Sequence, residues 1–142
     1  MIENITNRFV VPDCPLSETD FINTILDKTG CKMLVDLANT HINSVNHKFD
    51  PYKWLDQINL DAIEGVHLAG GDEEDGVLYD SHATNVPKPV WDLYQYLVQK
   101  KKPNVTIIER DQNIPTFELL MKEVDVANSI LFADKKQAGV SR

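Results

Sequence analysis

The chain has 142 residues, which is enough for one domain with its own core, and its formal net charge of −8 argues against a nucleic-acid surface or a basic membrane patch. It has no apolar run of membrane-spanning length and no signal-peptide pattern, and Cys14 and Cys31 form no CxxC motif. We therefore expect a soluble, cytoplasmic protein with two reduced, structural thiols.

The chain opens with the end of a strand and then a helix. Residues 1–5 have the pattern of the last residues of a strand. Ser17 and Asp20 have the spacing of a capping box, with Asp in place of the usual Glu or Gln, and they predict a helix start. Gly30 is a good terminator for that helix.

A second strand and a second helix follow. Residues 32–36 predict a short buried strand that ends in an acid. A polar loop containing Asn39 and His41 is expected next. The segment 50–58 then predicts a helix, because Pro51 suits the first helical position after an Asp cap.

The third predicted strand, residues 62–67, leads into a segment rich in glycine and acids. Residues 70–76 contain four acids in succession, from Asp72 to Asp75. A calcium-binding loop would alternate its ligands with other residues. We therefore interpret this run as a solvated loop.

The last third of the chain predicts helix, strand and helix. Apolar residues from Val90 to Val98 recur at i, i+3, i+4, i+7 and i+8, the pattern of an amphipathic helix. Residues 105–109 predict a buried strand that ends in an acid, and 116–131 predict a final helix. Residues 134–142 are expected to form a disordered tail. The alternation of strands and helices predicts an α/β domain over 1–133 with a parallel sheet.

Metal-binding residue types end four of the predicted strands: Glu3, Asp36, His67 and Glu109. Active sites of parallel α/β barrels lie at this end of the strands. Asp80 and His82 are two residues apart in an extended segment, so their side chains can face one point. Imidazole and carboxylate together suit zinc, iron or manganese better than calcium or magnesium. One such residue alone is more often structural, but the whole set indicates a multinuclear metal site.

Other site chemistries have less support. The sequence contains no GxGxxG, P-loop, HExxH or GxSxG motif, and no serine or cysteine nucleophile with an evident base. Glu3 and Glu109 could be the carboxylate pair of a glycoside hydrolase, but the histidines would then have no role.

Six segments in this order resemble the MbnB/TglH family of multinuclear non-haem iron enzymes, and the resemblance extends from residue 2 to about residue 133. The segments are Glu3-Asn4-Ile5, Leu34-Val35-Asp36 with Asn39, residues 45–51, Val66-His67-Leu68-Ala69-Gly70, Asp80-Ser81-His82 and residues 108–115. Ala38 departs from the family pattern, which commonly has asparagine there. His41 falls where the family often has an aromatic residue, so it is not counted as a ligand.

The resemblance implies a TIM-like barrel and an oxidative activity. It implies two or three irons that act with dioxygen on cysteine residues of a ribosomally made precursor peptide, presented by a partner protein. It places the metal-binding positions at Glu3, Asp36, Asn39, His67, Asp80, His82 and Glu109. We expect Glu3 to bridge two irons and the site to leave an open position for the substrate thiolate.

Family members are roughly twice as long as this chain. The chain is therefore expected to form about half of a TIM-like barrel, the C-terminal half, as a fragment, a split gene product or a truncated reading frame. Half a barrel leaves open sheet edges, so an N-terminal half-barrel chain or self-association is expected to cover them. The predicted activity belongs to the completed barrel, and the chain alone can be inactive. The alternatives are another divalent-metal barrel enzyme of isomerase or phosphodiesterase type, with zinc or manganese, and an inactive half-barrel remnant.

Overall fold

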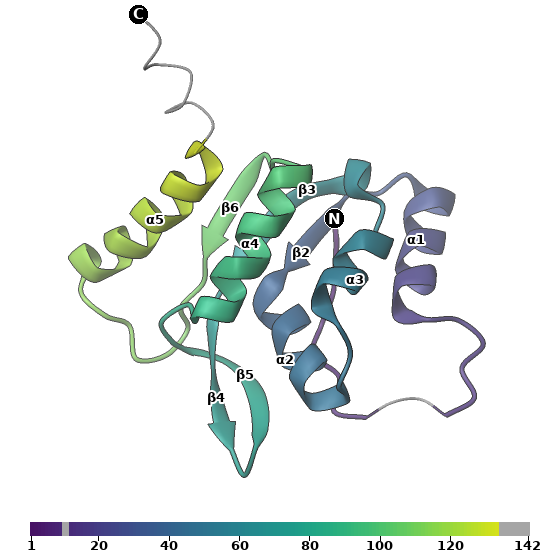
Figure 1. Cartoon of the computed structure of the whole chain (residues 1–142), viewed down its shortest axis with the longest axis horizontal. Helices are drawn as coiled ribbons and strands as arrows, with labels where there is room; N and C mark the ends of the chain where they lie inside the picture. Colours follow the sequence, from purple (N-terminus) through teal and green to yellow (C-terminus); the bar gives the residue numbers. More distant parts are fainter. Residues whose placement is uncertain (10–11, 134–142) are drawn as a thin grey trace, which may run out of the picture.

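The computed structural model describes residues 1–9 and 12–133 (Figure 1). Four parallel strands form one sheet in the order β1-β2-β3-β6: β1 (Ile2–Glu3), β2 (Met33–Asp36), β3 (Ile63–Leu68) and β6 (Val105–Ile108). The helices are α1 (Glu18–Thr29), α2 (Leu37–His47), α3 (Pro51–Gln57), α4 (Lys88–Lys100) and α5 (Phe117–Leu131), with a 3-10 turn, η1 (Leu60–Ala62). The predicted parallel β/α units are confirmed. Within the described residues the sheet has β1 and β6 as its edges and does not close into a barrel.

Two of the predicted helix starts have the expected caps. The Ser17 hydroxyl accepts a hydrogen bond from the Asp20 backbone N–H at 3.1 Å, and Gly30 ends α1 in the left-handed conformation with φ 67°. Asp50 caps α3, where its Oδ1 accepts from the Tyr52 N–H at 2.9 Å. Short helices such as α3 depend on such caps because they contain few internal hydrogen bonds.

We expect Asp50→Ala to lower the free energy of unfolding by about 1 kcal/mol, because the first backbone N–H groups of α3 lose their acceptor. Asp50→Asn keeps an acceptor and should stay close to the wild type. Urea denaturation followed by circular dichroism compares the three chains. Equal losses for both variants would contradict the capping role.

The polar loop predicted around Asn39 and His41 is wrong, because these residues lie in α2. Asp36, the last residue of β2, caps this helix directly, so no loop intervenes. Asparagine is a weak helix former, which disguised the helix in the sequence. In the folded chain Asn43 instead donates to the Ile5 carbonyl at 2.9 Å, and such tertiary contacts outweigh the low helix propensity.

The solvated loop predicted for residues 70–76 is also wrong in its backbone. β4 (Gly70–Glu74) and β5 (Val77–Thr84) form an antiparallel hairpin that extends away from the main sheet (Figure 1). Asp75 and Gly76 make its turn with φ of 51° and 79°, the positive values that an Asp-Gly hairpin turn requires. The four acids do face solvent, so their exposure was predicted and their strand pairing was missed.

The two faces of the four-stranded sheet differ in their surroundings. Met33, Val35 and Val66 are fully buried and belong to the hydrophobic core together with α4 residues such as Leu97. On the other face Val105 and Ile107 remain 42% and 43% exposed. In a closed β/α barrel the second face would be the interior.

Three further predictions concern the ends of the chain and its chemistry. Cys14 and Cys31 are both free thiols, as expected. The tail predicted for 134–142 lies outside the described residues. Among the described helices, none combines the length and apolar character needed to cross a bilayer.

Candidate metal centre

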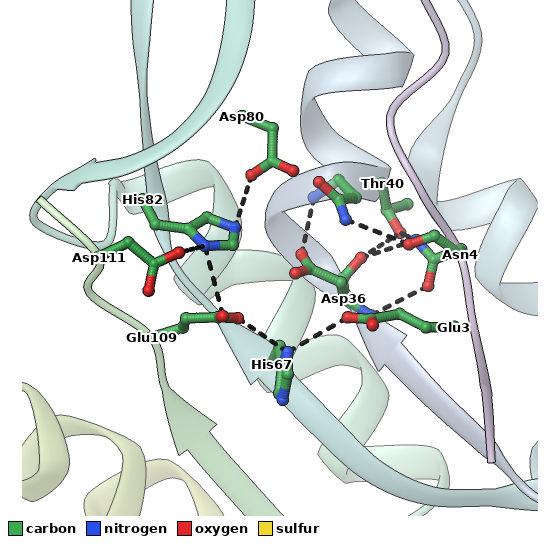
Figure 2. A network of polar contacts seen from close by, with 10 residues as sticks. Glu3, Asn4, Asp36, Thr40, His67, Asp80, His82, Glu109 and Asp111 are labelled. Carbon is green, nitrogen blue, oxygen red and sulfur yellow. Dashed lines mark hydrogen bonds and ion pairs between the residues drawn. The ribbon is translucent and has the colours of Figure 1, made fainter.

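Strand register brings the predicted strand-end residues onto one face of the sheet. Asp36 of β2 lies opposite His67 of β3, and Glu3 ends β1 opposite the residue two positions before Asp36. Residues paired across parallel strands, and residues two apart along a strand, point to the same side. Glu109 follows β6 directly, and its carboxylate reaches the same point (Figure 2). The shared side is the face that the helices leave open.

His67 lies between two carboxylates. Its Nδ1 is 2.9 Å from Glu109 Oε2 and 3.2 Å from Glu3 Oε1, and the side chain is 15% exposed. Despite these short distances Nδ1 makes no hydrogen bond of acceptable geometry. The three groups therefore lie at ion-pair distance around one position, without a hydrogen bond that would satisfy Nδ1.

Asp36 is the most deeply buried of the carboxylates, at 1% exposure. Its Oδ1 accepts from the Asn39 backbone N–H at 2.8 Å, whereas its Oδ2 has no hydrogen-bond partner. Burial raises the pKa of Asp36 to about 6, against the lowering effect of the Asn39 N–H, and the nearby Asp80 carboxylate raises it further. The buried Oδ2 lone pairs are thus available to a cation.

The hairpin delivers Asp80 and His82 to the same place. His82 Nε2 lies 2.6 Å from Asp80 Oδ1, so the two side chains meet as the two-residue spacing predicted. The backbone differs from a regular strand, because His82 has a left-handed φ of 49°. Burial acts to lower the pKa of His82, but the carboxylates of Asp80, Asp111 and Glu109 raise it above its ordinary value.

Two contributors to this cluster were missed from the sequence. Asp111 Oδ2 accepts a hydrogen bond from His82 Nδ1 at 3.1 Å, and the Asp111 backbone N–H donates to the His82 carbonyl. Asn4 bonds to Asp36 and Asn39. Asp111 lies two residues after Glu109, a spacing that could have indicated it, whereas only the fold shows what Asn4 contacts.

A buried ion pair anchors the loop that carries Glu109 and Asp111. Arg110 Nη2 lies 2.9 Å from Glu123 Oε2 of α5, with side-chain exposures of 5% and 13%. The other Glu123 oxygen accepts from the Val86 backbone N–H at 2.7 Å. Through Glu123, the loop after β6 is connected to the segment after the hairpin. This connection fixes the position of Glu109 relative to His82.

The residues fit a metal site. Two groups each offer ligand atoms within 4.8 Å of one another: Glu3, Asp36 and His67, and Asp36, His82 and Glu109. Four buried donor atoms in the cluster lack hydrogen-bond partners: Asp36 Oδ2, Asn39 Oδ1, His67 Nδ1 and His82 Nε2. Unpaired buried polar atoms are rare in folded proteins, and bound cations would satisfy all four. Donor atoms about 3 Å apart are also what bonds of about 2.1 Å to one ion produce at right angles.

The four parallel strands with their helices correspond to part of a β/α barrel, and the carboxylates and histidines lie at the C-terminal end of the strands, where such barrels carry their sites. Comparison with known families gives the specific assignment. Residues 1–132 match the family described as RiPP precursor modification enzyme MbnB/TglH/ChrH, where RiPP denotes a ribosomally made, modified peptide. The chain belongs to this family, which confirms the resemblance drawn from the sequence.

Similar curated proteins carry the name UPF0276. One from Acaryochloris marina is 37% identical over 96% of this chain and 50% of its own length. One from Rhizorhabdus wittichii is 36% identical over 97% of this chain and 49% of its own length. One from Streptomyces avermitilis is 39% identical over 92% of this chain and 27% of its own length. The chain therefore spans about half the length, or less, of these relatives.

Proposed function

We propose that this chain is part of a multinuclear non-haem iron enzyme that oxidatively modifies cysteine residues of a ribosomally made precursor peptide with dioxygen. The family description supports a precursor peptide as the substrate. The observation that carries the proposal is the cluster of four buried nitrogen and oxygen atoms that lack hydrogen-bond partners at the C-terminal end of the strands. This mixed donor set suits iron, with zinc and manganese as alternatives.

Several residues of the chain would act together as metal ligands. Asp36 belongs to both ligand groups, which supports a shared role for its carboxylate, beside the bridging role expected for Glu3. Asn39 and Asp80 would complete the set through their oxygens. Iron, when bound, supplies the redox chemistry with dioxygen. The protein's part is to fix the ligands and to leave room for the soft thiolate of the substrate cysteine.

The open face supports a need for a partner that completes the barrel. Val105 and Ile107 lie half exposed beside the candidate ligands, and β1 and β6 have unpaired outer edges within the described residues. Unpaired edges and exposed apolar residues favour association. We propose that an N-terminal half-barrel, or a second copy of the chain, covers this face, and that a further partner protein presents the peptide.

The first test is the metal content and solution mass of the purified chain, prepared without oxygen. We expect two or three irons per barrel-sized assembly, measured by elemental analysis with Mössbauer or EPR spectroscopy. Adding a cysteine-containing precursor peptide and dioxygen should then change the peptide mass, and a peptide with serine in place of cysteine should stay unchanged.

Three results would contradict this proposal in different ways. Zinc or manganese with oxygen-independent turnover would indicate the isomerase or phosphodiesterase type of barrel enzyme. A metal-free, aggregating chain would indicate a half-barrel remnant, whose ancestral activity belongs to longer relatives. Iron binding without any peptide modification would support the proposed metal site and contradict the proposed substrate.

A further inference from the structure

Asn4 directly follows Glu3 and is 3% exposed. Its side-chain amide pairs with both backbone groups of Asp36: Nδ2 donates to the Asp36 carbonyl at 2.9 Å, and Oδ1 accepts from the Asp36 N–H at 2.9 Å. This is the pairing that a neighbouring strand would make. The side chain therefore extends the contact between β1 and β2 beyond the last paired residue of β1, whose strand has only two residues.

The main chain of Asn4 acts on a second candidate ligand. Its carbonyl accepts from Asn39 Nδ2 at 3.1 Å, which leaves the other end of that amide, Asn39 Oδ1, buried without a partner. Asn4 Nδ2 also donates to the Thr40 hydroxyl at 3.1 Å. One residue thus holds the end of β2 and the first turn of α2 (Figure 2).

We propose that Asn4 is a positioning residue of the candidate metal centre, which aims Asp36 Oδ2 and Asn39 Oδ1 at the metal position beside Glu3. This inference rests on the proposed metal-binding function. Asn4 is not itself among the groups that could hold an ion. Its role is to fix the ligands on either side of it through hydrogen bonds made in a buried, low-dielectric setting, where such bonds are strong and their loss is costly.

Asp36 and Asn39 each have one side-chain oxygen without a hydrogen-bond partner, so other contacts must hold these side chains in place. Left free, either side chain would rotate to satisfy that oxygen with a backbone or solvent donor. Asn4 Oδ1 already accepts from the Asp36 backbone N–H, so that donor is not available to Asp36 Oδ2, and the Asn4 backbone carbonyl accepts a hydrogen bond from Asn39 Nδ2. The unpaired oxygens are then held toward the cluster.

The chain contains a control asparagine away from the candidate ligands. Asn23 of α1 also bonds two backbone groups through its side-chain amide: Nδ2 donates to the Gln57 carbonyl at 2.7 Å, and Oδ1 accepts from the Asn59 N–H at 2.9 Å. These bonds join α1 to the end of α3, and none of the three residues is a candidate ligand. Asn4→Ala and Asn23→Ala therefore each remove a pair of hydrogen bonds to the backbone, and only the first pair lies beside the metal position.

The experiment measures binding of metal alone to the purified full chain. Fe(II) is titrated without oxygen against a competing chelator, and Co(II) is used separately because its visible absorption reports ligand geometry. We expect Asn4→Ala to weaken binding by about 10–100-fold and to alter the Co(II) spectrum, as for other residues that orient metal ligands. Asn23→Ala should bind metal as the wild type does, although both variants lose thermal stability.

Thr40→Val provides a second variant in case Asn4→Ala does not fold. It keeps the side-chain shape and removes the hydroxyl that bonds to Asn4 Nδ2 and to the Asp36 carbonyl. We expect a smaller loss of affinity with a folded chain, and Thr40→Ser should restore wild-type binding.

The outcomes separate this inference from the proposed function. A wild-type chain that binds neither metal overturns both. Wild-type binding with unchanged affinity and Co(II) spectrum in Asn4→Ala, or in Thr40→Val where the alanine variant is unfolded, overturns the positioning role alone. Equal losses of metal affinity in Asn4→Ala and Asn23→Ala would assign Asn4 to general stability and also reject that role.

Discussion

His67→Ala is expected to strip the metal from the chain and to abolish peptide modification. His67 Nδ1 lies between Glu109 and Glu3, at 2.9 and 3.2 Å, so its removal takes away the nitrogen donor that links the two carboxylates. Substituting a residue that orients a metal ligand without binding the metal lowers metal affinity by about 10–100-fold, and loss of a ligand should lower it more. Anaerobic iron content after desalting, followed by the peptide mass assay, measures both effects.

His41→Ala is the control for this experiment. His41 lies in α2 and makes no contact with the candidate ligands among the interactions resolved in the described residues; burial lowers its pKa below the ordinary value. We expect that variant to keep its iron and its turnover. An alanine at position 67 that left iron content and turnover unchanged would count decisively against the site.

The candidate site was more accessible to sequence reasoning than the fold around it. Strand ends at Glu3, Asp36 and His67 could be predicted because short apolar runs end there, and parallel strands align such ends at one edge. The helix containing Asn39 could not be predicted in this way, since its asparagines gain their stability from tertiary hydrogen bonds. Periodicity along the chain carries no information about such partners.

The hairpin was missed for a different reason. Asp75-Gly76 is a strong turn signal, but the acids before it are poor strand formers and favoured a loop. The hairpin matters because it carries Asp80 and His82 back to the sheet. Alternation predicted that these two side chains meet, although the left-handed backbone at His82 was not foreseeable from the sequence.

Asp36→Asn is expected to stabilise the metal-free chain at pH 7 while removing metal binding. Burial raises the pKa of Asp36 from 3.8 to about 6, so the folded chain binds this proton more tightly than the unfolded chain does. The wild type therefore loses stability as pH rises from about 4 to about 6, and at neutral pH the buried carboxylate costs on the order of 3 kcal/mol. Asparagine keeps the helix cap to Asn39 and carries no charge.

Urea denaturation of metal-free protein at several pH values tests this. Asp36→Asn should exceed the wild type by on the order of 2–3 kcal/mol at pH 7, and the difference should vanish below about pH 4. A variant less stable than the wild type at pH 7 would contradict the pKa assignment.

Metal should reverse the order of stability. Because Asp36 belongs to both candidate ligand groups, only the wild type should be stabilised by added Fe(II), by about 2.7 kcal/mol when the free metal is a hundredfold above its dissociation constant. The same carboxylate must lose its proton to bind a cation, so wild-type affinity should fall as pH drops below about 6. A metal ligand is expected both to destabilise the metal-free protein as a buried carboxylate and to stabilise the protein when a cation binds. A carboxylate that only caps a helix would destabilise the metal-free protein and would give no stabilisation by metal.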